Sequence, residues 1–320
     1  MIPALVLTAG LATRLRPLSL VRAKAALPVA GDPLVRRILR WLAGHGAADA
    51  VLNLHHLPHT ITGVIGDGGD IGIRVRYSWE TPVLGSAGGP RRALPLLGAS
   101  PFLIINGDTL TDVDVAALVA DHQRSGALVT MAVVPNTEPD KYGGVVVEPD
   151  SSVSGFAKRE SAYLFVGVQV ASAGAFASLA DDVPSESVGA RYPALIAERR
   201  GSVRALVTSA QFFDIGTPRD YLRTSLLFAR TSIPDSRVPA PESPLIGART
   251  RIASSARIED SVVWDDVEVG VDVRLHRCVV TDGVRVPAGS SWEHATIRVA
   301  GDELTDAERR VGDLAIGSIP

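Results

Sequence analysis

Apolar runs alternate with polar, glycine-containing stretches along the first two thirds of the chain. The run at residues 4–7 has no polar residue on either face, which is typical of a buried parallel strand. Further strands are predicted after it, with helices between several of them, and this alternation predicts an α/β fold. These strands cover residues 50–54, 73–78, 101–105, 128–134, 145–148, 153–156 and 204–207.

Helices are predicted where capping residues precede a periodic apolar segment. Asp32 and Pro33 suit the N-cap and first position of a helix that reaches about His45. Thr217 and Pro218 suit the same positions of a later helix. The other predicted helices cover residues 90–97 and 192–199, and the last one ends near Arg230.

The hydrophobic period changes to six beyond residue 245. Apolar residues recur every sixth position within each set, and the sets are separated by one-residue slips. Such a period predicts a short hexapeptide-repeat β-helix, because ordinary antiparallel strands would show a period of two. The sets are Ile246, Ile252 and Ile258, then Val263, Val269 and Leu275, then Val280 and Val286.

These patterns divide the chain into four parts. Residues 1–230 form the α/β domain, and 231–244 form a stiff linker that contains four prolines. Residues 245–297 form the β-helix, and 298–320 are expected to be a partly mobile tail. A short β-helix leaves its last coil uncovered, so a homo-oligomer is expected.

Composition narrows the class of protein. With 320 residues, of which 46% are hydrophobic, the chain can bury a large core. A net charge of −3 argues against a general nucleic-acid binder. The single cysteine, Cys278, cannot form an internal disulfide, which fits a reducing cytoplasm. No apolar run reaches about 18 residues, so no membrane span is expected.

The first strand breaks at Ala9-Gly10 into a segment rich in cations. Small residues there let backbone N–H groups approach a phosphate chain, and arginines can fork onto phosphate oxygens. The segment is not a Walker loop, because no G-x-x-x-x-G-K-[ST] occurs in it. A basic surface loop is the alternative from composition alone. The segment carries Thr13, Arg14, Arg16, Arg22 and Lys24.

Two aspartates follow predicted strands. Asp108 ends the strand at 101–105, and Asp214 ends an apolar stretch before the last helix. The carboxyl ends of parallel strands form the crevice where doubly wound sheets bind ligands, and carboxylates there are suited to hold Mg²⁺ against phosphate oxygens. A helix N-cap is the alternative for Asp108. With Arg14 and Lys24, the two aspartates make a set suited to phosphoryl transfer.

The histidines give weaker evidence for a functional site than the two aspartates do. His55, His56 and His59 invite a metal interpretation, but a polar turn is favoured because no matching carboxylate or cysteine spacing follows. His276 and His294 are isolated in the sequence, so we expect them to be surface or packing residues.

The segment from Gly10 to Leu18 (Gly-Leu-Ala-Thr-Arg-Leu-Arg-Pro-Leu), with Lys24 and the Leu-Pro-Val that follows it, resembles the signature of the sugar-1-phosphate nucleotidylyltransferases. Ala12 stands where that family has its second glycine, and Ala23 where it has a proline. The resemblance covers residues 4 to about 230 and extends to a hexapeptide tail. It implies a Rossmann-like, doubly wound, mostly parallel sheet followed by a left-handed β-helix.

The resemblance also implies a reaction and roles in it. An NTP and a sugar 1-phosphate would give an NDP-sugar and pyrophosphate. Mg²⁺ would be held by Asp108 and Asp214, while Arg14 and Lys24 would stabilise the pyrophosphate and the α-phosphate. The nucleotide would contact Leu7, Ala9, Gly10, Thr13, Gly85, Ser86, Ala87 and Gly88, and the sugar phosphate Gly143, Lys158 and Gly167.

The substrate pair stays open at this point. GTP with mannose 1-phosphate is preferred, because the catalytic domain, the hexapeptide stack and the Leu-Gly-Ser-Ala-Gly turn are similar to mannose-1-phosphate guanylyltransferases. Segments such as Asn53-Leu-His-His instead resemble uridylyltransferases that act on N-acetylmuramate 1-phosphate. Ala157 and Phe165 replace the family's glutamate and asparagine near the sugar, and a non-catalytic NDP-sugar-binding paralogue is the remaining alternative.

Overall fold

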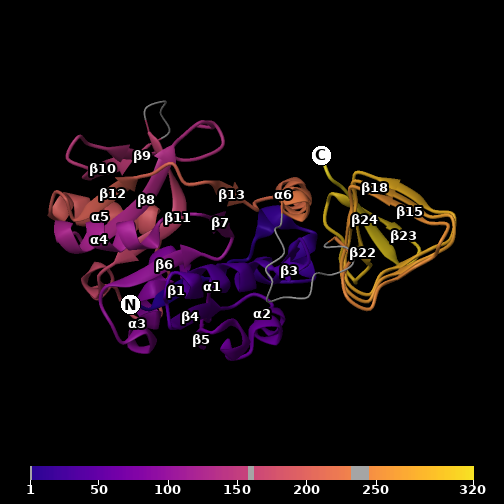
Figure 1. The fold of residues 1–320 in the computed structure, drawn as a ribbon, viewed down its shortest axis with the longest axis horizontal. Helices are drawn as coiled ribbons and strands as arrows, with labels where there is room; N and C mark the ends of the chain where they lie inside the picture. Colours follow the sequence, from indigo (N-terminus) through magenta and orange to yellow (C-terminus); the bar gives the residue numbers. More distant parts are fainter. Residues whose placement is uncertain (1, 158–161, 232–244) are drawn as a thin grey trace. The chain divides into compact units, whose positions relative to one another are not determined.

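The computed structural model describes residues 2–157, 162–231 and 245–320, and these form two compact units (Figure 1). Unit 1 contains the chain up to Gly10 together with Val35–Phe213, and unit 2 contains Leu11–Leu34 together with Asp214–Pro320. The predicted boundary near residue 230 does not coincide with this division, because Leu11–Leu34 and the residues from Asp214 onward group with the β-helix. Lys158 and the linker at 232–244 lie outside the described residues.

The sheet of unit 1 is built around β1. β1 is a central strand with a parallel neighbour on each side, and Ala4, Leu5 and Val6 are fully buried. A parallel strand whose two faces are both covered carries apolar residues throughout, which explains the wholly apolar run. The predicted strands are confirmed to within two residues at each end. The parallel neighbours are β1 (Ala4–Leu7) with β4 (Asp49–Leu54) and β6 (Phe102–Asn106), β4 with β5 (Arg74–Trp79), and β8 (Val129–Pro135) with β12 (Val203–Val207).

One long strand of the sheet was not predicted. β11 (Tyr163–Ala171) lies antiparallel between β6 and β8, so the sheet is mixed rather than purely parallel. Its pairing with β8 shifts register between Phe165 and Gln169, around Gly167, whose φ is 80°. The predicted strands at its edge are confirmed as the hairpin β9 (Val145–Val147) and β10 (Val153–Phe156).

Helices cover this sheet, and two of them begin elsewhere than predicted. Asp32–Pro33 is the short strand β3, which pairs with β2 (Pro28–Val29), so α1 begins only at Leu34. α3 begins at Gly85 rather than residue 90, so the predicted glycine-rich loop is the first turn of a helix. The helices are α1 (Leu34–Gly44), α2 (Pro58–Ile65), α3 (Gly85–Leu97), α4 (Val115–Ser125) and α5 (Tyr192–Glu198).

Unit 2 contains a β-helix whose coils repeat every 17 residues, which pairs Arg251 with Glu268 and Glu268 with Arg285. Two steps of six and one of five make this repeat, so the one-residue slips in the sequence mark one corner of each coil. The sheets are β14 (Arg251–Ile252), β17 (Glu268–Val269) and β20 (Arg285–Val286); β15 (Arg257–Glu259), β18 (Arg274–His276) and β21 (Ser291–Glu293); and β16 (Val262–Val263) and β19 (Val279–Val280), continued by β22 (Ala295–Val299).

The prediction that residues 298–320 form a partly mobile tail is wrong. β22 pairs antiparallel with β24 (Leu314–Ser318), which pairs with β23 (Glu308–Val311). Leu314 and Ile316 belong to the hydrophobic core of the β-helix, so the chain covers its own last coil. This removes the premise from which the homo-oligomer was predicted.

Unit 2 also contains one long helix, α6 (Pro218–Thr231). Its predicted start is confirmed, since the hydroxyl of Thr217 accepts a hydrogen bond from the Asp220 amide at 3.1 Å. In the part of the chain that the structure describes, no helix is both long and apolar enough to cross a membrane.

Candidate active site

A buried polar network joins the carboxyl ends of three strands in unit 1. The Thr8 amide donates to Oδ1 of Asn53 at 2.6 Å, and Nδ2 of Asn53 donates to Oε1 of Glu80 at 2.7 Å. Oε2 of Glu80 accepts the Leu84 amide at 2.9 Å. The ends of β1, β4 and β5 are thereby fixed to the start of α3. Sequence reasoning missed Asn53 and Glu80, although a polar residue that closes a buried strand was the available signal.

The glycine-rich turn expected to receive the base is held by a neighbouring segment of unit 1. Gly85 has a φ of 75°, and a Cβ atom there would lie 2.6 Å from Oε1 of Glu186. The Ser86 hydroxyl donates to Oε2 of the same carboxylate at 2.7 Å, and the Ala87 amide donates to the Ser185 carbonyl oxygen at 2.9 Å. The turn is therefore fixed in position, while part of its hydrogen-bonding capacity is already used.

Gly167 lies beside Asn106 and Thr109, two of the residues that surround Asp108 in the sequence. Asp108 is half-buried just after β6, and the Thr109 hydroxyl lies 3.5 Å from its Oδ1. A Cβ atom at Gly167 would lie 2.5 Å from Oγ1 of Thr109 and 3.0 Å from Nδ2 of Asn106. Only glycine fits this position, so the register shift in β11 places backbone directly beside the residues that flank Asp108.

A cavity of about 440 Å³ lies beside the β9–β10 hairpin. Ala157 and Phe165, which replace two polar residues of the family, both line it. The wall is apolar as a result, and it offers few groups to hydrogen-bond sugar hydroxyls. Its other lining residues include Tyr142, Gly143, Gly144 and Phe156.

In unit 2, three of the predicted residues are brought together. Nζ of Lys24 lies 4.0 Å from Oδ1 of Asp214, and both side chains are largely buried. A Cβ atom at Gly216 would lie 3.0 Å from Oδ2 of Asp214 and 3.7 Å from Nη1 of Arg14. Arg14 itself is exposed. One carboxylate and two cations thus meet around a glycine, although Lys24 and Asp214 are distant in the sequence.

Ala12 adopts a conformation that favours glycine. Its φ is 48° and its ψ is 47°, in the left-handed region, at the start of a 3₁₀ turn formed by Thr13–Leu15. The Ser19 hydroxyl donates to the Ala12 carbonyl oxygen at 2.9 Å, which helps to hold the turn. The family's second glycine therefore has a physical reason here, and alanine occupies its position under strain.

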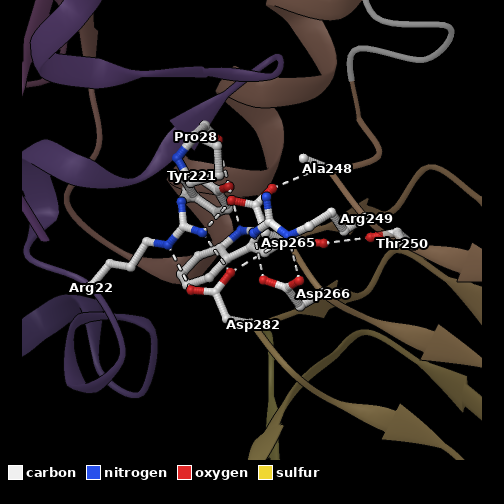
Figure 2. Close-up of polar contacts among 10 residues, drawn as sticks. Arg22, Pro28, Tyr221, Ala248, Arg249, Thr250, Asp265, Asp266 and Asp282 are labelled. Atoms are coloured by element: carbon white, nitrogen blue, oxygen red, sulfur yellow. Dashed lines mark hydrogen bonds and ion pairs between the residues drawn. The ribbon is translucent and has the colours of Figure 1, made fainter. Parts of the chain in front are cut away.

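Arg22 does not belong with the phosphate-binding cations, in contrast to the expectation from composition. Its guanidinium donates to both carboxylate oxygens of Asp282 at 2.6 Å and to Asp265 at 2.7 Å. Figure 2 shows these contacts, which tie the cationic segment to the β-helix. The partners of Arg22 lie more than 240 positions away in the sequence, so no local pattern indicated them.

His276 and His294 are partly exposed surface residues, as expected, but they are not isolated from each other in space. Nδ1 of His276 lies 2.8 Å from Oε1 of Glu293, and the two histidine rings are 6.0 Å apart. The 17-residue repeat stacks position 276 on position 293, which the sequence period alone did not make apparent. Elsewhere, Nδ1 of His55 lies 2.9 Å from the Glu80 carbonyl oxygen at the end of β4, where a polar turn was predicted.

Comparisons with known proteins agree with this architecture. A family model described as nucleotidyl transferase matches residues 3–230, and one described as GlmU-like, C-terminal hexapeptide matches residues 210–296. The chain therefore belongs to the nucleotidyl transferase family. It is a nucleotidyltransferase enzyme, as the resemblance to sugar-1-phosphate nucleotidylyltransferases predicted, and the non-catalytic alternative is not supported.

Individual relatives are similar over most of the chain. A mannose-1-phosphate guanylyltransferase of Mycobacterium tuberculosis is 29% identical over 90% of this chain and 82% of its own length. A mannose-1-phosphate guanyltransferase of Gibberella zeae is 29% identical over 92% and 85%. The crystal structure of HddC from Yersinia pseudotuberculosis complexed with GMP-PN has a TM-score of 0.62 at 23% identity, covering 71% of this chain and all of that one. This last similarity concerns the fold alone.

Proposed function

We propose that the protein transfers a guanylyl group from GTP to mannose 1-phosphate, giving GDP-mannose and pyrophosphate. The observation that carries this proposal is the grouping of Lys24, Arg14 and Asp214 in a chain whose relatives are named for that reaction. Two cations beside a carboxylate suit a reaction in which negative charge moves between phosphate groups.

The proposed chemistry needs no general base, because the attacking oxygen of the sugar phosphate is already an anion. It displaces pyrophosphate in line at the α-phosphorus of the nucleotide. Lys24 stabilises charge on the α-phosphate, and Arg14, which is exposed, stabilises the departing pyrophosphate. Gly143, Gly167 and Lys158 are proposed to hold the sugar phosphate.

The proposed metal is Mg²⁺, held by Asp108 and Asp214. The donor set fits a hard cation, since both residues offer carboxylate oxygens and lie at or just after the end of a strand. When bound, Mg²⁺ neutralises charge on the two phosphates. A Cβ atom at Gly216 would lie 3.0 Å from Oδ2 of Asp214, so glycine leaves room beside this carboxylate.

The nucleotide is proposed to lie against the backbone of Leu7, Ala9, Gly10 and Thr13 and against the first turn of α3. The fixed position of that turn supports this role, because a base can be selected only by groups that do not move away from it. Gly88 donates its amide to the Ser185 carbonyl oxygen at 3.1 Å, which adds to this rigidity.

Pyrophosphate release tests the proposal directly. Each of the four NTPs is combined with mannose 1-phosphate, glucose 1-phosphate and N-acetylmuramate 1-phosphate. We expect the highest kcat/KM with GTP and mannose 1-phosphate. A preference for another nucleotide or sugar would reject this substrate pair, and no release with any pair would reject the reaction.

One observation favours a second candidate. Ala157 and Phe165 make the cavity beside the β9–β10 hairpin apolar, which suits a sugar with an apolar substituent better than one with free hydroxyls. In a uridylyl transfer to N-acetylmuramate 1-phosphate, the methyl groups of the N-acetyl and lactyl substituents would supply such apolar contacts. UTP with that sugar is therefore the most informative competing pair in the assay.

Assembly is a separate proposal. Although β24 covers the last coil, Ile252 of the first coil is 40% exposed in the described part of the chain. We propose that a second copy covers this surface. Light scattering is expected to give more than one chain, and an Ile252→Glu variant is expected to give fewer. A monomer in both cases would contradict this.

A further inference from the structure

The β-helix stacks two aspartates at the face that Arg22 contacts. Asp265 and Asp282 occupy the same position of successive coils, 17 residues apart, and the Asp265 amide donates to Oδ1 of Asp282 at 3.1 Å. Oδ1 of Asp265 also accepts the Ala248 amide at 2.7 Å, so the β-helix backbone fixes both carboxylates. Like charges at stacked positions repel each other. Arg249 of the β-helix is attracted to both carboxylates, but its own hydrogen bonds go to Asp266.

Arg22 supplies the compensating charge from outside the repeat. It forks onto Asp282, contacts Asp265, and lies with its guanidinium carbon 5.3 Å from the centre of the Trp264 ring. Burial by itself would lower the pKa of Arg22, but the hydrogen bonds and attraction of Asp282 and Asp265 raise it above its ordinary value. The side chain of Arg22 is 13% exposed and thus held on all sides.

A second connection joins the β-helix to the same segment. Nε1 of Trp264 donates to the Tyr221 hydroxyl at 2.8 Å, and that hydroxyl donates to the Pro28 carbonyl oxygen at 2.6 Å (Figure 2). Trp264 and Tyr221 are both fully buried, and their rings meet edge to face. The hydroxyl therefore makes two hydrogen bonds in a dry environment, which fixes the backbone at Pro28.

These connections stand on either side of the proposed catalytic lysine. Lys24 lies two residues after Arg22 and four before Pro28, and it begins a 3₁₀ turn at Lys24–Ala26. Both ends of this short stretch are thus attached to residues that the β-helix holds. A shift of the attachment would move Nζ of Lys24 relative to Asp214.

We propose that Arg22 is a positioning residue, through which the β-helix holds Lys24 in place for phosphoryl transfer. The β-helix then has a part in the reaction rate in addition to any part in assembly. The proposal rests on the proposed function only for the role of Lys24. It assigns no contact between Arg22 and substrate.

The test distinguishes a change in the position of Lys24 from a change in the thermal stability of the protein. We expect Arg22→Ala to lower kcat by about 10- to 100-fold, as small misplacements of catalytic groups do, with KM changed less than about threefold. Arg22→Ala also leaves Asp265 and Asp282 to repel each other, so stability falls. Adding Asp282→Asn removes that repulsion, and the double variant is expected to regain thermal stability while kcat stays low. Recovery of both would overturn the proposal, because stability alone would then explain the loss.

A matched control removes another buried ion pair of unit 2. Arg298 forks onto Glu308 at 2.7 and 2.9 Å, and both side chains are less than 10% exposed. Arg298→Met is expected to lower stability without changing kcat.

Arg22→Lys serves if Arg22→Ala does not fold, because lysine keeps the charge but cannot donate two parallel hydrogen bonds to a carboxylate. An Arg22→Lys enzyme with the kcat of the parent would overturn the proposal.

Hydrogen exchange gives a readout that needs no substrate. In Arg22→Ala/Asp282→Asn, amides of residues 18–30 are expected to exchange faster, while those of the β-helix core stay protected. In Arg298→Met the segment is expected to keep its protection. Unchanged exchange at 18–30 in the double variant would overturn the proposal, even if the sugar substrate proves to be another one.

Discussion

Nζ of Lys24 lies 4.0 Å from Oδ1 of Asp214, and both residues belong to the unit that contains the β-helix. The chain leaves this unit after Leu34 and returns to it at Asp214. Lys24 is suited to bind a phosphate, and Asp214 is suited to bind a metal. The two residues are adjacent only because the chain returns to this unit. The predictions that follow start from this pair.

The two proposed metal ligands should be indispensable. Asp108→Asn and Asp214→Asn keep the shape of each side chain but weaken its hold on a cation. We expect each to lower kcat by at least about 100-fold, with little change in thermal stability. The measurement is pyrophosphate release across a Mg²⁺ titration.

Asp114→Ala is the control for these variants. Oδ1 of Asp114 accepts the Ala117 amide at 3.0 Å and caps α4, so its loss should cost about 1 kcal/mol of stability. Turnover should stay unchanged. Near-parental activity of either asparagine variant at limiting Mg²⁺ would show that the metal assignment is wrong.

Arg14 and Arg16 form a matched pair of exposed arginines two positions apart. We expect Arg14→Ala to lower kcat by about two orders of magnitude, the loss typical of one transition-state donor, and Arg16→Ala to have little effect. Steady-state kinetics with saturating nucleotide distinguishes them. Equal effects in the two variants would indicate that only the total positive charge of the cationic segment matters, and that Arg14 has no specific role.

Ala12→Gly should stabilise the protein. The left-handed backbone at Ala12 destabilises a residue with a Cβ atom by about 1–2 kcal/mol. Glycine avoids this strain, but its greater conformational entropy in the unfolded chain lowers the free energy of unfolding by about 0.4–1 kcal/mol. The net gain is expected to lie between about 0 and 1.6 kcal/mol in urea unfolding, with kcat unchanged. Ala93→Gly, inside α3, should instead lose about 1 kcal/mol. Destabilisation by Ala12→Gly would contradict the strain at this position.

His122 should make stability depend on pH. Burial lowers its pKa below 6.5, opposed in part by the attraction of Asp121, and its ring nitrogens lie 3.0 Å from Oγ1 of Thr130 and 3.1 Å from Oγ of Ser172. As the pH falls below 6.5, the unfolded chain takes up a proton that the folded chain resists. The free energy of unfolding should therefore decrease.

The contribution of His122 is obtained as a difference between proteins. Unfolding free energies are measured from pH 7.5 to about pH 5 for the parent, for His122→Gln and for His45→Gln. The slope should be smaller in His122→Gln than in the parent, and His45→Gln controls for the replacement of an exposed histidine. The same slope in all three proteins would show that His122 does not contribute.

The sequence by itself determined the elements whose signal is local. The buried run of β1 and the six-residue period with its slips each specify a structure through the spacing of apolar side chains, and Thr217 marks a helix start through its own hydroxyl. The aspartates after strands and the Gly10–Leu18 signature likewise indicated the class of chemistry before any coordinates.

Only the tertiary structure decided which distant residues meet. Arg22 looks like another phosphate ligand in the sequence, and its pairing with Asp282 depends on how the cationic segment packs on the β-helix. The antiparallel strand β11 and the Asn53–Glu80 network depend in the same way on strand order and register. The spacing of residues along the chain indicates which face of an element a residue occupies. The partner that a residue contacts on that face is fixed by packing, so the sequence could not indicate the partner.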